Sequence, residues 1–150
     1  MNPGWIEESL YSMIKEKIPL PCVDLLVMHQ DRLLLMKRRN NPAKGLWFTP
    51  GGRIYKGESL EEAVTRVLSE ETGLNPAKIT QCGAMSHNWP EVQTITVYYR
   101  VDVDSDIVIM NNEHEDYRWV SESDKTMHPY LIQMIRISEI FCARMIENYL

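Results

Sequence analysis

Several features that would mark a secreted or membrane-bound protein are missing from this sequence. It has only three cysteines, Cys22, Cys82 and Cys142, which are odd in number and form no Cys-x-x-Cys pair, so neither a disulfide framework nor a thiolate metal site is indicated. The N-terminal segment is acidic where a signal peptide would be basic, and no apolar run approaches the roughly 20 residues that span a bilayer. We therefore expect a cytoplasmic protein without a membrane-spanning segment.

An excess of basic residues is also missing. The formal net charge is −5 and the pI is about 5.4, which argues against a protein that binds nucleic acid through a basic face. An anionic small substrate would therefore need local basic side chains or a metal ion. Internal repeats, low-complexity tracts and linkers are absent as well, so we expect residues 1–150 to form a single domain that buries roughly two-thirds of its unfolded surface.

What the sequence does contain is an alternation of helix and strand patterns. Ser59 and Glu62 have the spacing of a capping box, and Gly73 suits the end of the helix that would follow. Gln30 and Asp31 alone separate two β-rich runs, which predicts a tight hairpin. The expected elements are helices within 4–17, 60–72 and from 129 to about 148, and strands at 22–29, 32–39, 79–85, 93–103 and 116–120.

The predicted C-terminal helix carries more isoleucine than one narrow face can bury. Ile132, Ile137 and Ile140 lie outside the face formed by its other apolar residues. Either the helix buries a wide face in the core, or these three side chains meet a second subunit. The second alternative would make the protein a homodimer.

Glu71 is the least expected side chain of the central helix. At about 100° per residue, it lies near the middle of a stripe of five apolar side chains. Burying an ionised carboxylate without a partner costs several kcal/mol, and the last turn of a helix is unfavourable for negative charge. A bound cation would remove both objections. The stripe consists of Leu60, Ala63, Val64, Val67 and Leu74.

A ladder of charges flanks this stripe, because Glu62, Arg66 and Glu70 follow one another at four-residue spacing. These three could be ordinary surface ion pairs, which contribute a few tenths of a kcal/mol each. Alternatively, Arg66 could orient Glu71 as a neighbour of a metal ligand does. Oxygen ligands favour Mg²⁺, with Mn²⁺ as the alternative, over zinc.

The spacing of residues 52–74 resembles the Nudix box, G-x5-E-x7-R-E-U-x-E-E-x-G-U, in which U is a bulky aliphatic residue. Eight of its nine fixed positions match, including Gly52, Glu58, Arg66 and Glu71. The exception is Val67, where the family usually has a glutamate ligand. With one carboxylate fewer, a single magnesium ion is the more economical expectation.

Segments outside the box resemble one Nudix subfamily, GDP-mannose mannosyl hydrolase, which cleaves at the sugar carbon. The matching segments are P-L-P-C-V-D (19–24), K-R-R-N-N-P-A-K-G-L-W-F-T-P-G-G-R (37–53) and E-H-E-D-Y-R-W (113–119). This subfamily also lacks the glutamate that Val67 replaces. Two departures, Glu70 and Glu113, restore carboxylates of the kind used by relatives that cleave pyrophosphates. The loop 88–93 is shorter than in this subfamily, so the resemblance does not determine which residues contact the sugar.

The resemblance implies roles for individual residues. It implies a metal site made by Glu71, Glu113 and the Gly51 carbonyl with Glu70 close by. It further implies two arginines that clamp the phosphates and a histidine that acts as catalytic base. The box residues Glu58 and Arg66 are also expected to be catalytic residues. The clamp would be Arg38 and Arg53, the base His114, and the further substrate contacts Asp24 and His87.

The resemblance also implies a fold and three possible functions. The fold would be an α/β (α+β) Nudix fold, an α/β/α sandwich around a mixed sheet with an extra N-terminal helix and a long C-terminal helix, and the protein would be a homodimer. The leading function is Mg²⁺-dependent hydrolysis of GDP-mannose to GDP and mannose by attack of water at the anomeric carbon. The alternatives are attack at phosphorus of a nucleoside diphosphate sugar or nucleoside triphosphate, and a non-catalytic module that binds a nucleotide.

Overall fold

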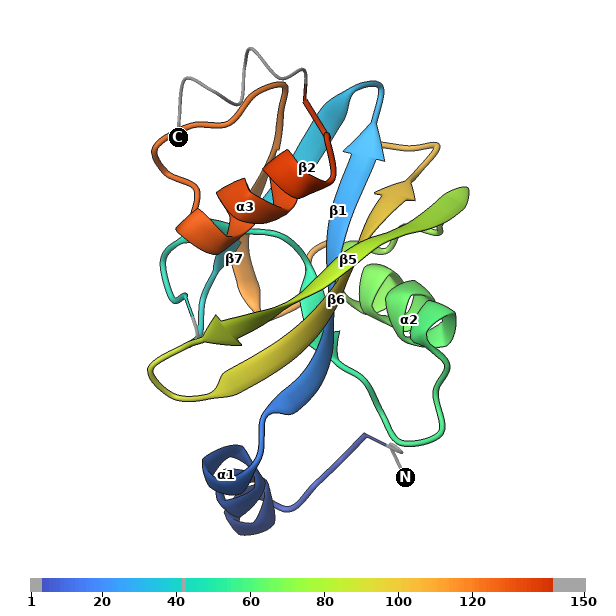
Figure 1. Cartoon of the computed structure of the whole chain (residues 1–150). Helices are drawn as coiled ribbons and strands as arrows, with labels where there is room; N and C mark the ends of the chain where they lie inside the picture. Colours follow the sequence, from blue (N-terminus) through green and yellow to red (C-terminus); the bar gives the residue numbers. More distant parts are fainter. Residues whose placement is uncertain (1–3, 42, 142–150) are drawn as a thin grey trace.

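The computed structural model describes residues 4–41 and 43–141, and its centre is a mixed sheet of seven strands (Figure 1). The strands follow the order β3-β2-β1-β6-β5, while β4 pairs with β1 and β7 with β2. The elements along the chain are α1 (Glu8–Lys17), β1 (Leu20–His29), β2 (Arg32–Arg38), β3 (Trp47–Phe48), β4 (Gly51–Arg53), α2 (Leu60–Thr72), β5 (Lys78–Asn88), β6 (Gln93–Asp102), β7 (His114–Val120) and α3 (Pro129–Ile137).

The centre of the sheet contains both kinds of strand pairing. Strands β1 and β2 form the expected antiparallel hairpin, with His29 paired to Arg32. Gln30 and Asp31 have φ angles of 49° and 64°, the left-handed geometry that a two-residue turn between twisted strands requires. On its other side β1 pairs with β6 in parallel. The prediction of a mixed sheet is therefore confirmed.

A separate apolar core lies on each face of the sheet, which is the predicted α/β/α sandwich. Helix α2 packs on one face, where Val64 and Leu68 meet Val23 and Leu25 of β1. Helix α3 packs on the other face, where Leu131 belongs to the second core. Strand β1 supplies buried side chains to both cores because successive side chains of a strand point to opposite faces.

The prediction of a long C-terminal helix is wrong in its length. Helix α3 ends at Ile137, and Glu139 has a φ of 53°, which a continuing helix cannot have. The chain then turns inward and buries Ile140 in the core beneath α3, against which Ile132 also packs. A wide core face therefore accounts for these two isoleucines, whereas Ile137 is 48% exposed. The remainder of the expected helix, 142–150, lies outside the described residues.

Helix α1 stands apart from both cores. It buries none of its residues, and Figure 1 shows it beside the start of β1, away from α2 and α3. Glu7 caps its first turn through the amide of Ser9. Within the described residues, no helix has the length and apolar character needed to cross a bilayer.

Candidate active site

Helix α2 fixes the position of Glu71 through its ends and its apolar face. The expected capping box is present, since Ser59 accepts from the Glu62 amide and Glu62 accepts from the Ser59 amide. At the other end Gly73 adopts the left-handed conformation, with a φ of 71°. The apolar stripe then turns Glu71 towards the sheet, and this side chain is only 4% exposed. The prediction of a buried carboxyl on the apolar face is confirmed.

The carboxyl of Glu71 meets two different groups at the sheet. Its Oε2 accepts a hydrogen bond of 3.1 Å from the Gly51 amide on β4. It also lies against the carboxyl of Glu113, which comes from the residue before β7. Burial, together with the charge of Glu113, holds the pKa of Glu71 well above its usual range, and nearby Arg38 lowers it only in part. A carboxyl pair of this kind binds either a proton or a cation.

Glu71 and Glu113 fit the requirements of a hard divalent cation. Two apposed carboxyls concentrate negative charge, and a cation would favour the ionised form of both. Among the described residues, no three His, Cys, Asp or Glu side chains form a cluster that could hold a metal ion. A cation between Glu71 and Glu113 would keep its other coordination positions for water or phosphate oxygens, as Mg²⁺ commonly requires. The carbonyl of Gly51 remains a predicted ligand.

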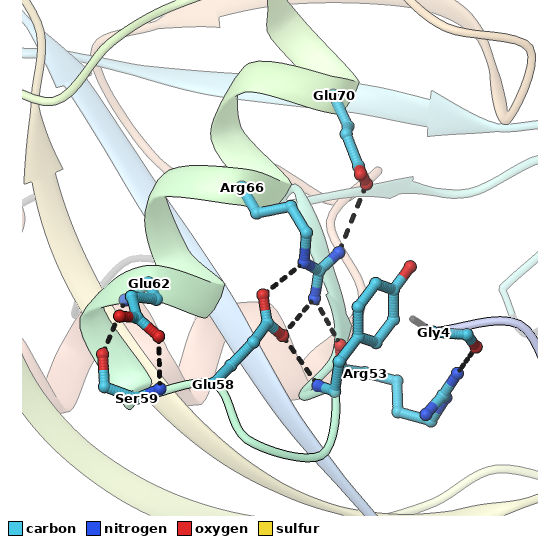
Figure 2. A network of polar contacts seen from close by, with 8 residues as sticks. Gly4, Arg53, Glu58, Ser59, Glu62, Arg66 and Glu70 are labelled. Carbon is cyan, nitrogen blue, oxygen red and sulfur yellow. Dashed lines mark hydrogen bonds and ion pairs between the residues drawn. The ribbon is translucent and has the colours of Figure 1, made fainter. Parts of the chain in front are cut away.

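Arg66 makes the expected ion pair with Glu70 and adds contacts that the helical spacing does not predict. Its guanidinium binds Glu58, the carbonyl of Arg53 at 2.8 Å and Glu70 at 3.2 Å (Figure 2), and it lies 3.6 Å from the centre of the Tyr55 ring. Glu58 also accepts from the Tyr55 amide at 2.7 Å. Arg66 and Glu58 thus fasten the loop between β4 and α2. The carboxyl of α2 that Arg66 contacts is Glu70.

A pocket of about 450 Å³ opens over these carboxyls. Its lining contains eight of the ten side chains singled out from the sequence, and it also contains Gly51. The eight are Asp24, Arg38, Arg53, Arg66, Glu70, Glu71, His87 and Glu113. These side chains come from four strands, one helix and the connection before β7, so the fold brings together residues that are far apart in the sequence. Glu58 contributes indirectly, through Arg66.

His114 lies behind the pocket wall. The sequence places it in a loop, but it is the first residue of β7, pairs with Arg38 of β2, and is 2% exposed. Its Nδ1 is 3.3 Å from the side-chain oxygen of Asn111, and Asn111 and Glu113 line the pocket where His114 does not. Burial and the positive charge of Arg38 lower the pKa of His114 to about 4, so its ring is neutral at pH 7.

Asp24 and His87 face each other across the pocket floor. His87 Nδ1 is 3.8 Å from Asp24 Oδ2, and the His87 ring stacks on Tyr130 with centroids 4.2 Å apart. Burial raises the pKa of Asp24 to about 6, although Thr96 and Arg38 lower it, and burial lowers the pKa of His87 to about 4. The short loop that follows His87 is a tight turn between β5 and β6.

The pocket has further lining residues that the sequence reasoning missed. Phe48 and Trp89 form an aromatic wall, with ring centroids 5.6 Å apart. Tyr11 and Lys15 reach the pocket from α1. The tryptophan next to proline at the hairpin tip was a detectable signal for Trp89. The apolar residues of α1 point to the wrong face, because Leu10 and Met13 are 49% and 57% exposed whereas Tyr11 and Lys15 line the pocket.

Known proteins resemble this chain in sequence and in fold. The model of the NUDIX domain matches residues 19–136. Two curated relatives are the low-salt glycan biosynthesis protein Agl8 of Haloferax volcanii, 31% identical over 84% of this chain and 86% of the relative, and the ADP-ribose pyrophosphatase of Methanocaldococcus jannaschii, 39% identical over 57% of this chain and 52% of the relative. Among solved structures, the MutT NUDIX hydrolase of Burkholderia pseudomallei has a TM-score of 0.73 at 21% identity, covering 80% of this chain and 98% of that one. The chain belongs to the Nudix family.

Proposed function

We propose that this protein hydrolyses a nucleoside diphosphate sugar with the help of a divalent cation, Mg²⁺ or Mn²⁺. The observation that carries the proposal is that two apposed carboxyls, Glu71 and Glu113, share one pocket with Arg38 and Arg53. A diphosphate carries negative charge that an acidic protein would otherwise repel. Arginines and a carboxylate-bound cation together supply the required positive charge.

The roles of the residues follow from their chemistry. Arg38 and Arg53 would bind phosphate oxygens, since a guanidinium offers paired N–H donors. Glu71 and Glu113 would hold the cation, with Glu70 at the rim, and the cation would act as a Lewis acid that stabilises the charge on the departing group. Glu58 and Arg66 would keep the loop of Arg53 in place. The pocket volume of about 450 Å³ suits a nucleotide-sized ligand.

The first candidate reaction is attack of water at the anomeric carbon of GDP-mannose, which yields GDP and mannose. The resemblance of 113–119 to the subfamily's base-bearing loop supports it, with His114 as the base. The low pKa of His114 keeps the ring neutral, as a base requires, but the ring must gain access to the pocket before it can bind water. Direct displacement would invert the configuration of the sugar. The relative Agl8, named for glycan biosynthesis, is consistent with a sugar nucleotide.

The second candidate is attack at phosphorus, which yields a nucleoside monophosphate and a sugar phosphate. It is favoured by Glu70 and Glu113, because both carboxyls line the pocket, where they could hold a cation beside a bound diphosphate. The relative named ADP-ribose pyrophosphatase points the same way. A module that binds a nucleotide without cleaving it is the third candidate, and the intact set of carboxyls and arginines argues against it.

One experiment separates the three candidates. The protein is incubated with GDP-mannose or ADP-ribose and Mg²⁺ in ¹⁸O-labelled water, and mass spectrometry identifies which product carries the label. Label in free sugar supports attack at carbon, whereas label in a nucleoside monophosphate or a sugar phosphate supports attack at phosphorus. Binding without turnover supports the third candidate and overturns the proposal.

A further inference from the structure

We propose that the N-terminal segment, residues 4–17, is a wall of the substrate pocket and that Lys15 binds the phosphate groups of the substrate. The segment precedes residues 19–136, which the NUDIX domain model matches. No role follows for it from the Nudix box. The inference rests on the proposed function only in taking a nucleoside diphosphate as the ligand.

The lining of the pocket carries the first step. Tyr11 and Lys15 lie one helical turn apart on α1, so both side chains leave the same face, and both reach the pocket. Lys15 Nζ lies 5.0 Å from the Tyr11 ring centre, and the Arg53 guanidinium lies 5.5 Å from the same ring. The aromatic ring thus holds two cations at one side of the pocket. Lys15 adds positive charge beside an arginine that already suits a phosphate.

The attachment of the segment to the loop after β4 carries the second step. Arg53 donates a hydrogen bond to the carbonyl of Gly4, and its guanidinium also contacts the Tyr55 ring, 4.9 Å from its centre. Gly4 packs so closely on Tyr55 that a Cβ at Gly4 would overlap the Tyr55 ring. In Figure 1 the N-terminal chain begins beside this loop and runs from there to α1. Since α1 buries none of its own residues, these contacts hold it over the pocket.

Hydrogen bonds of Arg53 and Arg66 connect the segment to one carboxyl of the pocket, that of Glu70. Gly4 accepts from Arg53, the carbonyl of Arg53 accepts from Arg66, and Arg66 binds Glu70 (Figure 2). Displacement of the segment would therefore release the side chain of Arg53 as well as remove Lys15. For this reason the segment contributes to ligand binding through two cations, although only Lys15 belongs to it.

The first test measures ligand binding without turnover. The full chain and its Lys15→Ala, Lys15→Arg and Lys17→Ala variants are titrated calorimetrically with GDP and with ADP in the presence of Mg²⁺. Loss of one charged contact to phosphate predicts binding about five- to tenfold weaker for Lys15→Ala, with a larger effect at low salt. Lys15→Arg should retain binding because it keeps the charge. Lys17→Ala is the matched control, since Lys17 is exposed on the same helix and does not line the pocket.

Unchanged binding of both nucleotides to Lys15→Ala overturns the inference. This test measures binding, so the inference can fail or hold independently of the proposed hydrolysis. If the protein cleaves no nucleotide sugar but Lys15→Ala weakens GDP binding, the inference holds and the proposed function fails. A wild-type chain that binds neither nucleotide overturns both.

The second test addresses the attachment. Gly4→Ala should displace the segment, because the added methyl group overlaps the Tyr55 ring. It should weaken GDP binding at least as much as Lys15→Ala, and the double variant should bind about as weakly as Gly4→Ala alone, since the two changes act on one contact. Urea unfolding provides the check that the cores are intact. Normal GDP binding by a folded Gly4→Ala variant would show that the segment does not form the pocket wall.

Discussion

Arg66 and Glu58 form a two-point ion pair, with Nε to Oε2 at 2.6 Å and Nη2 to Oε1 at 2.9 Å. The two side chains are eight residues apart and join α2 to the loop that precedes it. Burial disfavours the charged form of Glu58, but the hydrogen bonds from Arg66 outweigh it and lower the pKa of Glu58. This pair therefore organises the end of β4, at Arg53, and the loop that follows it, which carries Tyr55.

Replacing Arg66 with lysine should destabilise the protein by about 1–2 kcal/mol, because an ammonium cannot reproduce the two-point contact with Glu58. Urea unfolding at pH 7 measures the change. The control is Arg32→Lys in the more exposed pair with Asp106, where we expect less than about 0.5 kcal/mol. Equal effects of the two substitutions would contradict a special role for the Arg66–Glu58 pair.

Glu71→Gln should abolish the effect of metal on stability. In the wild type, Mg²⁺ or Mn²⁺ should raise the melting temperature, since a ligand that binds only the native state stabilises it. The variant should show no such rise, and its turnover should fall by about 10²-fold or more, since the Lewis acid is lost. The control is Glu61→Gln on the exposed face of the same helix. A metal-dependent rise that persists in Glu71→Gln would remove this residue from the metal site.

His87 should make the protein more sensitive to acid. Its pKa is about 4 in the folded state against 6.5 for the ordinary group, so protons bind the unfolded chain more tightly. Stability from this group is full above pH 6.5 and is lost as the pH falls from 6.5 towards 4. Between pH 7 and pH 4.5 the unfolding free energy of the wild type should fall by on the order of 2 kcal/mol more than that of a His87→Asn variant. Parallel profiles, measured by urea unfolding, would show that His87 does not titrate in this way.

His114→Gln distinguishes a base from a buried structural side chain. If attack occurs at carbon with His114 as the base, turnover should fall by about 10²-fold or more while metal binding persists. If attack occurs at phosphorus, the substitution should leave turnover within about fivefold of the wild type, provided that urea unfolding shows an intact fold. A small loss with normal metal binding would end the assignment of His114 as the base.

The parts of the fold that the sequence predicts are those that local physics determines. The caps at Ser59 and Gly73 delimit α2, and the same helical periodicity that turns Val64 and Leu68 into the core buries Glu71 with them. The turn at Gln30 and Asp31 is equally local. Each of these features depends on residues within a few positions of one another, so spacing alone reveals them.

The missed features depend on contacts between distant residues. The end of α3 at Ile137 is not marked by periodicity, because burial of Ile140 in the core decides it. His114 occupies a polar run, yet the pairing of β7 with β2 buries it. Arg66 has several possible partners on a helical wheel, and only the path of the loop after β4 brings Glu58 into reach. For the same reason the contribution of α1 to the pocket could not be read from its residues.

Val67 leaves the pocket with one negative charge fewer than a glutamate at the same position would give. This side chain lines the pocket in the box position that usually carries a glutamate. A bound cation would therefore have fewer anionic protein ligands and more positions for the oxygens of the substrate. Metal and nucleotide would then complete each other's coordination, and each would tighten the binding of the other by the same factor. Occupancy of the complete site would then rise with both concentrations, so the level of free Mg²⁺ would limit turnover just as the level of nucleotide sugar would.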